Sequence, residues 1–155
     1  MDETDETPWE ATRADLRSMA AELDAAGWET LSIVAGDTAP LTPTDGPETD
    51  DRLGLVHVIQ GDSADALERF VKACTFSRSE AYLAIVDGTE YAVTVVRDPD
   101  ERCAVLLASA FEYRQAADCF AAAVRDDRIA TYTQRLDGTP VATFEHDDST
   151  IFEPR

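Results

Sequence analysis

The sequence predicts an α+β domain with a mainly antiparallel sheet, and three observations lead to this fold class. The first is a β-rich stretch, residues 82–111, in which two turn signals separate three strands. The second is a set of three segments with apolar residues at helical spacing, each suited to packing one face on a sheet. The third is the order: helix, two strands, helix, three strands, helix, two strands. This order is typical of helices placed around an antiparallel sheet.

The first helix is expected to follow an acidic lead-in, residues 1–6, that we expect to be disordered. Thr7, Pro8 and Glu10 form a strong helix start. The threonine can cap, the proline suits the first turn, and the glutamate can bond back to the cap residue. An apolar stripe follows, and Gly27 supplies the stop. A single domain is expected to begin here and to run to residue 145.

Two strands are predicted next, over residues 28–35 and 53–59. Residues 36–51 lie between them and consist largely of Pro, Gly, Thr and Asp. This composition predicts a long loop, and the scarcity of apolar anchors predicts that the loop is mobile. After the second strand, Gly61-Asp62-Ser63 leads into a second helix that Asp62 or Ser63 can cap.

The central meander is predicted in most detail. Asp87-Gly88 favours a type I′ turn that pairs Val86 with Thr89, and Asp98-Pro99 supplies the second reversal. Both faces of the first hairpin are then apolar, so both sides of this sheet should be at least partly covered. One face holds Tyr82, Ala84, Val86, Tyr91, Val93 and Val95, and the other holds Leu83, Ile85, Ala92 and Val96.

The C-terminal part is predicted to contain a third helix, residues 112–126, and a hairpin, residues 129–145, that turns at Asp137-Gly138. Pro140 cannot donate to a ladder, so the last strand should lie at a sheet edge or pair only partly. Residues 146–155 are expected to form a loosely held tail, although Ile151 and Phe152 could dock it.

The charge of the chain is extreme, with 13 Lys+Arg against 32 Asp+Glu and a formal net charge of −19. Such acidity can indicate a nucleic-acid mimic, a disordered chain or a protein of concentrated salt. Periodic apolar runs oppose disorder, and acids spread between structured segments oppose a mimic. At ~1 M salt the Debye length is about 3 Å, which screens self-repulsion. We therefore expect a halophilic protein at high salt. The lack of a basic stripe predicts no direct nucleic acid binding.

The N-terminal residues, the apolar runs and the cysteine spacing predict where the protein is located and the state of its thiols. The N-terminal residues show no signal-peptide pattern and no run is long enough to cross a bilayer, so we expect a cytoplasmic protein without membrane contact. Cys74, Cys103 and Cys119 are odd in number and widely spaced. They are interpreted as reduced, small buried hydrophobes, in preference to a disulfide framework or a metal site.

No convincing catalytic set emerges, and we predict no catalytic residue, cofactor or metal. Strand alternation turns His57 towards the core, where it is expected to be a hydrogen-bonded interior residue. His146 is expected in an exposed acidic tail, without the closed ligand set of a zinc site. Arg97 and Arg102 flank a charged turn that is either solvated, with weak ion pairs, or a partner contact.

Four strings of the chain resemble a group of small acidic haloarchaeal proteins of unknown function: GWET at 27–30, GLVHVI at 54–59, DGTEYAVTVVRDP at 87–99 and LDGTP at 136–140. The resemblance spans most of the chain and implies a shared fold and origin, with no assigned activity, cofactor or catalytic residue. The order of elements over about residues 7–126 is also similar to that of roadblock/longin-like and profilin-like modules, which implies a five-stranded sheet with helices on both faces.

Two functional hypotheses remain open, with a fainter third. The first is a non-enzymatic protein-interaction or regulatory module, as a homodimer or with a protein partner, to which Arg97 and Arg102 could contribute. The second is a small-molecule sensor or enzyme with a pocket near His57, lined in part by Tyr82 or Tyr91. The third is an acidic decoy for a nucleic-acid-binding partner, which requires acids gathered on one face.

Overall fold

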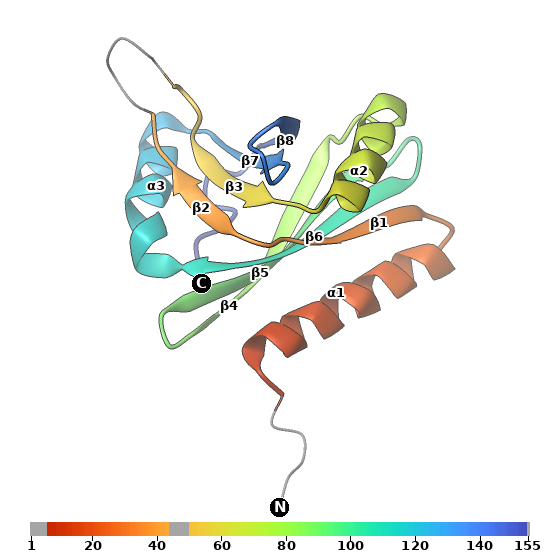
Figure 1. The fold of residues 1–155 in the computed structure, drawn as a ribbon, viewed down its shortest axis with the longest axis horizontal. Coiled ribbons are helices and arrows are strands. Elements are labelled where there is room, and N and C mark those ends of the chain that lie inside the picture. The colour runs from red at the N-terminus through yellow and green to blue at the C-terminus, as the bar shows by residue number, and fades with distance from the viewer. Residues whose placement is uncertain (1–5, 44–49, 155) are drawn as a thin grey trace, which may run out of the picture.

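The computed structural model describes residues 6–43 and 50–154, and these ranges contain three helices and eight strands (Figure 1). The α+β class is confirmed, and every predicted element is present in the predicted order, with one added strand. Residues 1–5 of the expected disordered lead-in lie outside the described residues. The elements are α1 (Pro8–Ala25), β1 (Glu29–Val34), β2 (Thr38–Leu41), β3 (Gly54–Val58), α2 (Gly61–Ala73), β4 (Arg78–Val86), β5 (Thr89–Asp98), β6 (Cys103–Glu112), α3 (Tyr113–Asp126), β7 (Ile129–Gln134) and β8 (Pro140–His146).

The strands form two four-stranded sheets, where the sequence predicted one. The meander sheet has the order β1-β6-β5-β4, and the second sheet has the order β2-β3-β7-β8. Each sheet contains one parallel pair, β1 with β6 and β3 with β7, and the other pairs are antiparallel. The five-stranded sheet implied by the roadblock/longin-like and profilin-like order is therefore not observed. Local periodicity predicts a strand, but it does not reveal which distant strand will be its neighbour.

The added strand corrects the prediction of a mobile loop over residues 36–51. Thr38–Leu41 form β2, which pairs antiparallel with β3 at the edge of the second sheet. Pro40 suits this place because an edge strand has one side on which no ladder donor is required. Residues 44–49 of the predicted loop lie outside the described residues.

The predicted meander is confirmed in register. Asp87 and Gly88 have φ values of 52° and 84°, as a type I′ turn requires, and Val86 pairs with Thr89. Helix α1 packs on the outer face of this sheet, where Leu16 and Ala20 meet an apolar cluster from β5 and β6. The capping box of Thr7 and Glu10 holds the start of α1 as predicted.

The other two helices lie at opposite ends of the space between the sheets (Figure 1). Leu67 of α2 and Phe120 of α3 each belong to a cluster that contains residues of both sheets. The expected cover on both faces of the meander is thereby confirmed. Helix α2 begins at Gly61 with Gln60 as its cap residue and without a side-chain cap bond, so the predicted capping by Asp62 or Ser63 is wrong.

The C-terminal segment is held more firmly than predicted. Strand β8 extends to His146, and Ile151 and Phe152 are buried. The Phe152 ring stacks on Phe120 at a centroid distance of 6.2 Å and meets the His146 ring edge-on at 5.6 Å. Aromatic burial of this kind is strong enough to fix a short tail, so of the two alternatives for this segment the structure has the one in which Ile151 and Phe152 dock it. Pro140 starts an edge strand, as predicted.

Candidate functional site

The free edge of β4 is the least protected sheet edge in residues 6–43 and 50–154. All nine residues of β4 pair continuously with β5, and the strand contains no proline, lysine or bulge. The other edges carry features that discourage pairing: β2 contains Pro40, β8 starts at Pro140 beside an irregular register, and β1 has only six residues. Proteins commonly protect sheet edges by such devices or by charged side chains, and residues 81–86 of β4 have none of these.

Apolar side chains are exposed along this edge. Tyr82 is 48% exposed, Ile85 is 42% exposed and Val86 is 39% exposed. Tyr82 and Val86 lie on the outer face of the sheet and Ile85 on the inner face, so both sides of the strand present apolar surface. Residues 81–86 also contain no charged side chain, in a chain of net charge −19.

A groove of about 180 Å³ runs between α1 and β4 and brings two of the predicted site residues together. Tyr82 and Arg97 both line it, and Arg97 forms an ion pair with Glu80 on the neighbouring strand. Burial raises the pKa of the Tyr82 hydroxyl, and the nearby Glu80 carboxylate raises it further. The groove is lined by Met19, Glu22, Leu23, Glu80, Tyr82, Val95 and Arg97.

The other two surface candidates lie elsewhere. Tyr91 pairs with Ala84 and shares the outer face with Tyr82, half-buried near the β4–β5 turn. The Arg102 guanidinium donates to the carbonyl of Ala26 and lies over the Trp28 ring, 6.0 Å from its centroid. Arg102 therefore joins the β5–β6 turn to the end of α1.

His57 is fully buried in the second sheet, which confirms its predicted core position. Its Nδ1 forms a hydrogen bond with the Thr38 hydroxyl at 2.9 Å, across the β2–β3 pair. Its Nε2 is buried and has no hydrogen-bond partner within the described ranges. Burial lowers the pKa of His57 to about 3, and the charge of protonated His146 would lower it in the same direction.

His146 corrects the prediction of an exposed tail histidine, since it is only 6% exposed. Its Nε2 and the Thr131 hydroxyl are 2.7 Å apart, and its Nδ1 and the Ser79 hydroxyl are 2.8 Å apart. Burial lowers the pKa of His146 to about 4, while Asp147 opposes that change. The ring thus links the second sheet to β4 as a neutral imidazole at pH 7.

Polar side chains also project from the inner face of the meander sheet. Glu90, Thr94 and Ser109 are at most 2% exposed, and their side-chain oxygens have no hydrogen-bond partner in the described part of the chain. A cavity of about 10 Å³ lies next to Thr94 between the sheets. That volume suits one water molecule and excludes an organic ligand. Neither this cavity nor the α1–β4 groove is lined by His57.

Glu90 is the most perturbed carboxyl group of this layer. It stands opposite Ile85 of β4 and Phe111 of β6. Burial raises the pKa of Glu90 to about 8, and the Glu153 carboxylate adds to the rise. A carboxyl group with this environment is largely protonated at neutral pH.

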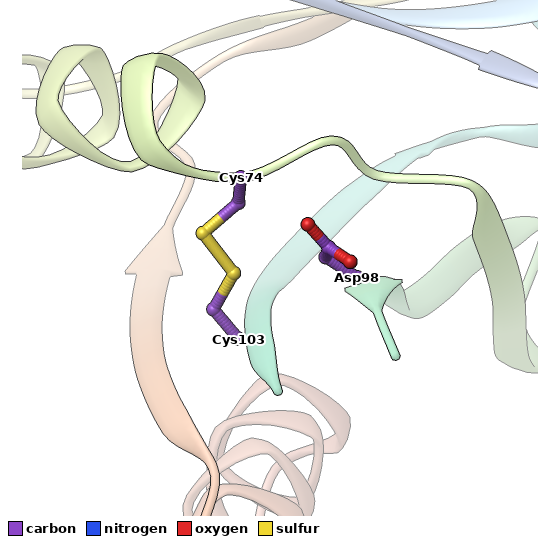
Figure 2. A group of neighbouring side chains, drawn as sticks. All are labelled: Cys74, Asp98 and Cys103. Atoms are coloured by element: carbon purple, nitrogen blue, oxygen red, sulfur yellow. A yellow bond between two sulfur atoms is a disulfide. The ribbon is translucent and has the colours of Figure 1, made fainter. Parts of the chain in front are cut away.

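A second cluster joins the end of α2 to the start of β6 (Figure 2). Cys74 and Cys103 form a disulfide, so the prediction of reduced thiols is wrong for this pair. The cysteines are 29 residues apart in the sequence, and folding brings their Cα atoms to 6.8 Å. Cys119 fits the prediction, because its thiol is free and buried, and the carbonyl oxygens of Leu41 at 3.3 Å and Gly54 at 3.4 Å lie within reach of its one proton.

Asp98 lies beside this disulfide and is almost fully buried (Figure 2). Its carboxylate accepts backbone N–H bonds from Thr75 at 2.7 Å, Asp100 at 3.0 Å and Glu101 at 3.2 Å. These bonds, led by that of Thr75, lower the pKa of Asp98. The predicted solvated turn is therefore tied to the segment that follows α2.

Sequence reasoning missed Glu90 and the disulfide. The first could have been found, because the predicted meander register turned Ala92 and Val96 to one face, and alternation places Glu90 and Thr94 on that same face. The second had no local signal. It depends on the contact between the end of α2 and the start of β6.

The fold and these sites define a small acidic α+β domain of two packed mixed sheets, with an exposed apolar strand edge at residues 81–86 of β4. None of the helices in the described ranges has the length and apolar character needed to span a bilayer. The chain belongs to DUF7529, a family of unknown function, which it matches over residues 1–154. Neither a curated protein nor a solved structure matches it. The resemblance to a family of unknown function is thus confirmed.

Proposed function

We propose that this protein is a non-enzymatic association module that forms a homodimer by pairing β4 with β4 of a second copy. The observation that carries the proposal is the edge of β4 over residues 81–86, which is uncharged, contains no bulge and exposes Tyr82 and Ile85. Alternate residues of an edge strand direct unpaired N–H and C=O groups outward, and a second antiparallel strand would satisfy them.

Charge favours a second copy over an oppositely charged partner. A basic partner would be attracted to carboxylates, whereas residues 81–86 have none. The same uncharged stretch lets two chains of net charge −19 approach along the edge with the least repulsion. Antiparallel pairing of two identical strands also generates a two-fold axis, which is the commonest symmetry of soluble dimers.

The proposal includes the surroundings of the dimer. We place it in concentrated salt in the cytoplasm of a halophilic archaeon, without direct binding to nucleic acid. The net charge of −19 supports the high salt, because self-repulsion between two copies is strong unless it is screened. The same charge opposes contact with a phosphate backbone.

Light scattering coupled to size-exclusion chromatography in 2 M KCl, over a wide concentration range, tests the dimer. The wild-type chain should be dimeric at high concentration, and Ile85→Lys should shift it to monomer, because a lysine on an edge strand opposes pairing. Leu136→Lys is the matched control. It makes the same substitution at an apolar residue, 87% exposed, between β7 and β8, and should leave the dimer unchanged.

A wild-type chain that stays monomeric at every concentration would refute the proposal. So would an Ile85→Lys variant that dimerises as strongly as Leu136→Lys. Circular dichroism should give the same folded signal for all three proteins, so that the comparison concerns association alone.

A further inference from the structure

The side chains of Cys74, Asp98 and Cys103 form a compact set of possible metal ligands. One ligand atom from each lies within 4.8 Å of the other two (Figure 2). Two sulfurs and one carboxylate oxygen match the donors that zinc accepts, and thiolates are poor ligands for Mg²⁺ or Ca²⁺. The donor set therefore points to a borderline-soft divalent cation.

Asp98 is oriented by the backbone rather than by a metal. Its Oδ2 accepts one N–H bond, from Thr75, and its Oδ1 accepts two, from Asp100 and Glu101. A carboxylate oxygen has two acceptor directions, so Oδ2 keeps one for a further contact. Hydrogen bonds of this kind hold a ligand in place before the metal arrives.

An open hollow of about 440 Å³ is lined by Asp98 and connects this carboxyl group with solvent. Asp100 and Glu101 line it together with Asp98, so the hollow has three acidic residues in its lining. Their field attracts cations, and the hollow has room for water beside Asp98. Ala73, Thr75 and Ser77 complete the lining.

We propose that Cys74, Cys103 and Asp98 form a redox-controlled zinc site. With the disulfide reduced, the two thiolates and the carboxylate bind Zn²⁺, and a water molecule from the hollow takes the fourth position. The disulfide is the metal-free state. Zn–S bonds of about 2.3 Å in a tetrahedron separate two sulfurs by roughly 3.8 Å, so metal binding and the S–S bond exclude one another.

A low-molecular-weight disulfide can act as the oxidant that converts the zinc-bound dithiolate into the metal-free disulfide. The Cys74 thiolate attacks that disulfide, forms a mixed disulfide and releases one small thiolate. The Cys103 thiolate then attacks the Cys74 sulfur, closes the protein disulfide and releases the second small thiolate. The two protein sulfurs lose two electrons, the oxidant gains them, and Zn²⁺ leaves unchanged. Cys74 suits the first attack because it is the less buried of the two cysteines.

Metal binding is tested on the full chain in 2 M KCl, with Co²⁺ as a coloured substitute for Zn²⁺ and a phosphine as reductant. The reduced protein should bind one equivalent and show thiolate-to-cobalt charge-transfer absorption, which Zn²⁺ should displace. The oxidised protein should show neither. A reduced protein without the absorption, or an oxidised protein that binds equally, would overturn the proposal.

Variants assign the ligands. Cys74→Ser should weaken Zn²⁺ binding by at least about 10-fold and remove part of the charge-transfer intensity. Asp98→Asn should also weaken binding, but its charge-transfer intensity should remain that of two bound thiolates. Cys119→Ser, the matched cysteine control, should bind as the wild type does. Binding by Cys74→Ser at wild-type strength would contradict the assignment. The oxidised and reduced wild-type chains provide a comparison that does not depend on any variant folding.

Discussion

Glu90 shows how one buried residue can set the response of the whole domain to pH. Its carboxyl group lies on the inner face of the meander sheet, fully buried, and its oxygens have no hydrogen-bond partner within residues 6–43 and 50–154. Burial raises its pKa from 4.5 to about 8. The folded state therefore holds a proton that the unfolded chain has lost across this interval, and stability falls as the pH rises through it.

We expect Glu90→Gln to remove that loss. Between pH 6.5 and 8 the wild-type chain should lose roughly 2 kcal/mol of unfolding free energy through this group, at about 1.4 kcal/mol per pH unit. The glutamine variant should lack this slope and should be the more stable protein above pH 8. Urea unfolding at several pH values measures both curves.

The histidines act in the opposite direction and equally in both proteins. Burial lowers the pKa of His57 to about 3 and that of His146 to about 4, so their contribution to stability is lost as the pH falls through about 6.5. The difference between the wild-type and Glu90→Gln curves therefore reports Glu90 alone. Parallel stability curves for the wild type and Glu90→Gln from pH 6.5 to 8 would show that Glu90 does not titrate in this way.

At the scale of elements, the contact between β3 and β7 depends on a glycine. Gly54 has φ +153°, and a Cβ added there would lie 1.8 Å from the carbonyl oxygen of Ala130 on the neighbouring strand. Gly54 pairs with Ala130 in the parallel register, so any side chain would push the two strands apart. This contact holds together the two halves of the second sheet.

Gly54→Ala should therefore destabilise the domain by more than about 3 kcal/mol, as expected when a substitution forces backbone to move in a packed core. Gly61→Ala is the control, because nothing lies within 4 Å of its added Cβ and its φ lies outside the left-handed region that disfavours side chains. It should change stability by no more than about 1 kcal/mol. Chemical unfolding of both variants gives the comparison, and equal stabilities would contradict the role of the close approach.

Elements were predictable where their signal is local. The capping residues Thr7 and Glu10 start α1, and Asp87-Gly88 forms the predicted turn, because both features involve neighbours in sequence. Strand β2 escaped prediction. Its four residues include Pro40, and it becomes a strand because β3 lies beside it.

At the scale of the molecule, the net charge of −19 determines the response to salt. Raising KCl from 0.1 M to 2 M shortens the Debye length from about 10 Å to less than 3 Å and screens the repulsion among surface carboxylates. We expect the melting temperature to rise by several degrees, since about 1 kcal/mol corresponds to roughly 2–4 °C in a domain near this size. Differential scanning calorimetry measures it.

NaCl at equal ionic strength should act as KCl does if screening is the cause. A domain that melts at the same temperature in 0.1 M and 2 M KCl would contradict the halophilic interpretation. Equal melting temperatures would also weaken the argument that salt permits two acidic copies to associate.

Like the elements of the fold, the features of the candidate sites were predictable only where they depend on neighbouring segments of the sequence. Tyr82 and Arg97 could be proposed from the meander, because their strands are neighbours in sequence and pair through a tight turn. The groove that unites them needs α1, which is distant in sequence. Two further contacts connect distant segments and could not be predicted from a local pattern. They are the disulfide between Cys74 and Cys103 and the packing of Phe152 on Phe120.

The sequence by itself determined the α+β class, the start of α1, the meander with its register, and the acidity, because each depends on residue type and short-range spacing. Only the tertiary structure decided the division into two sheets, the open edge of β4, the burial of Glu90 and the disulfide beside Asp98. These features arise where distant segments meet, and the free energy of such contacts belongs to the packed pair rather than to either segment alone.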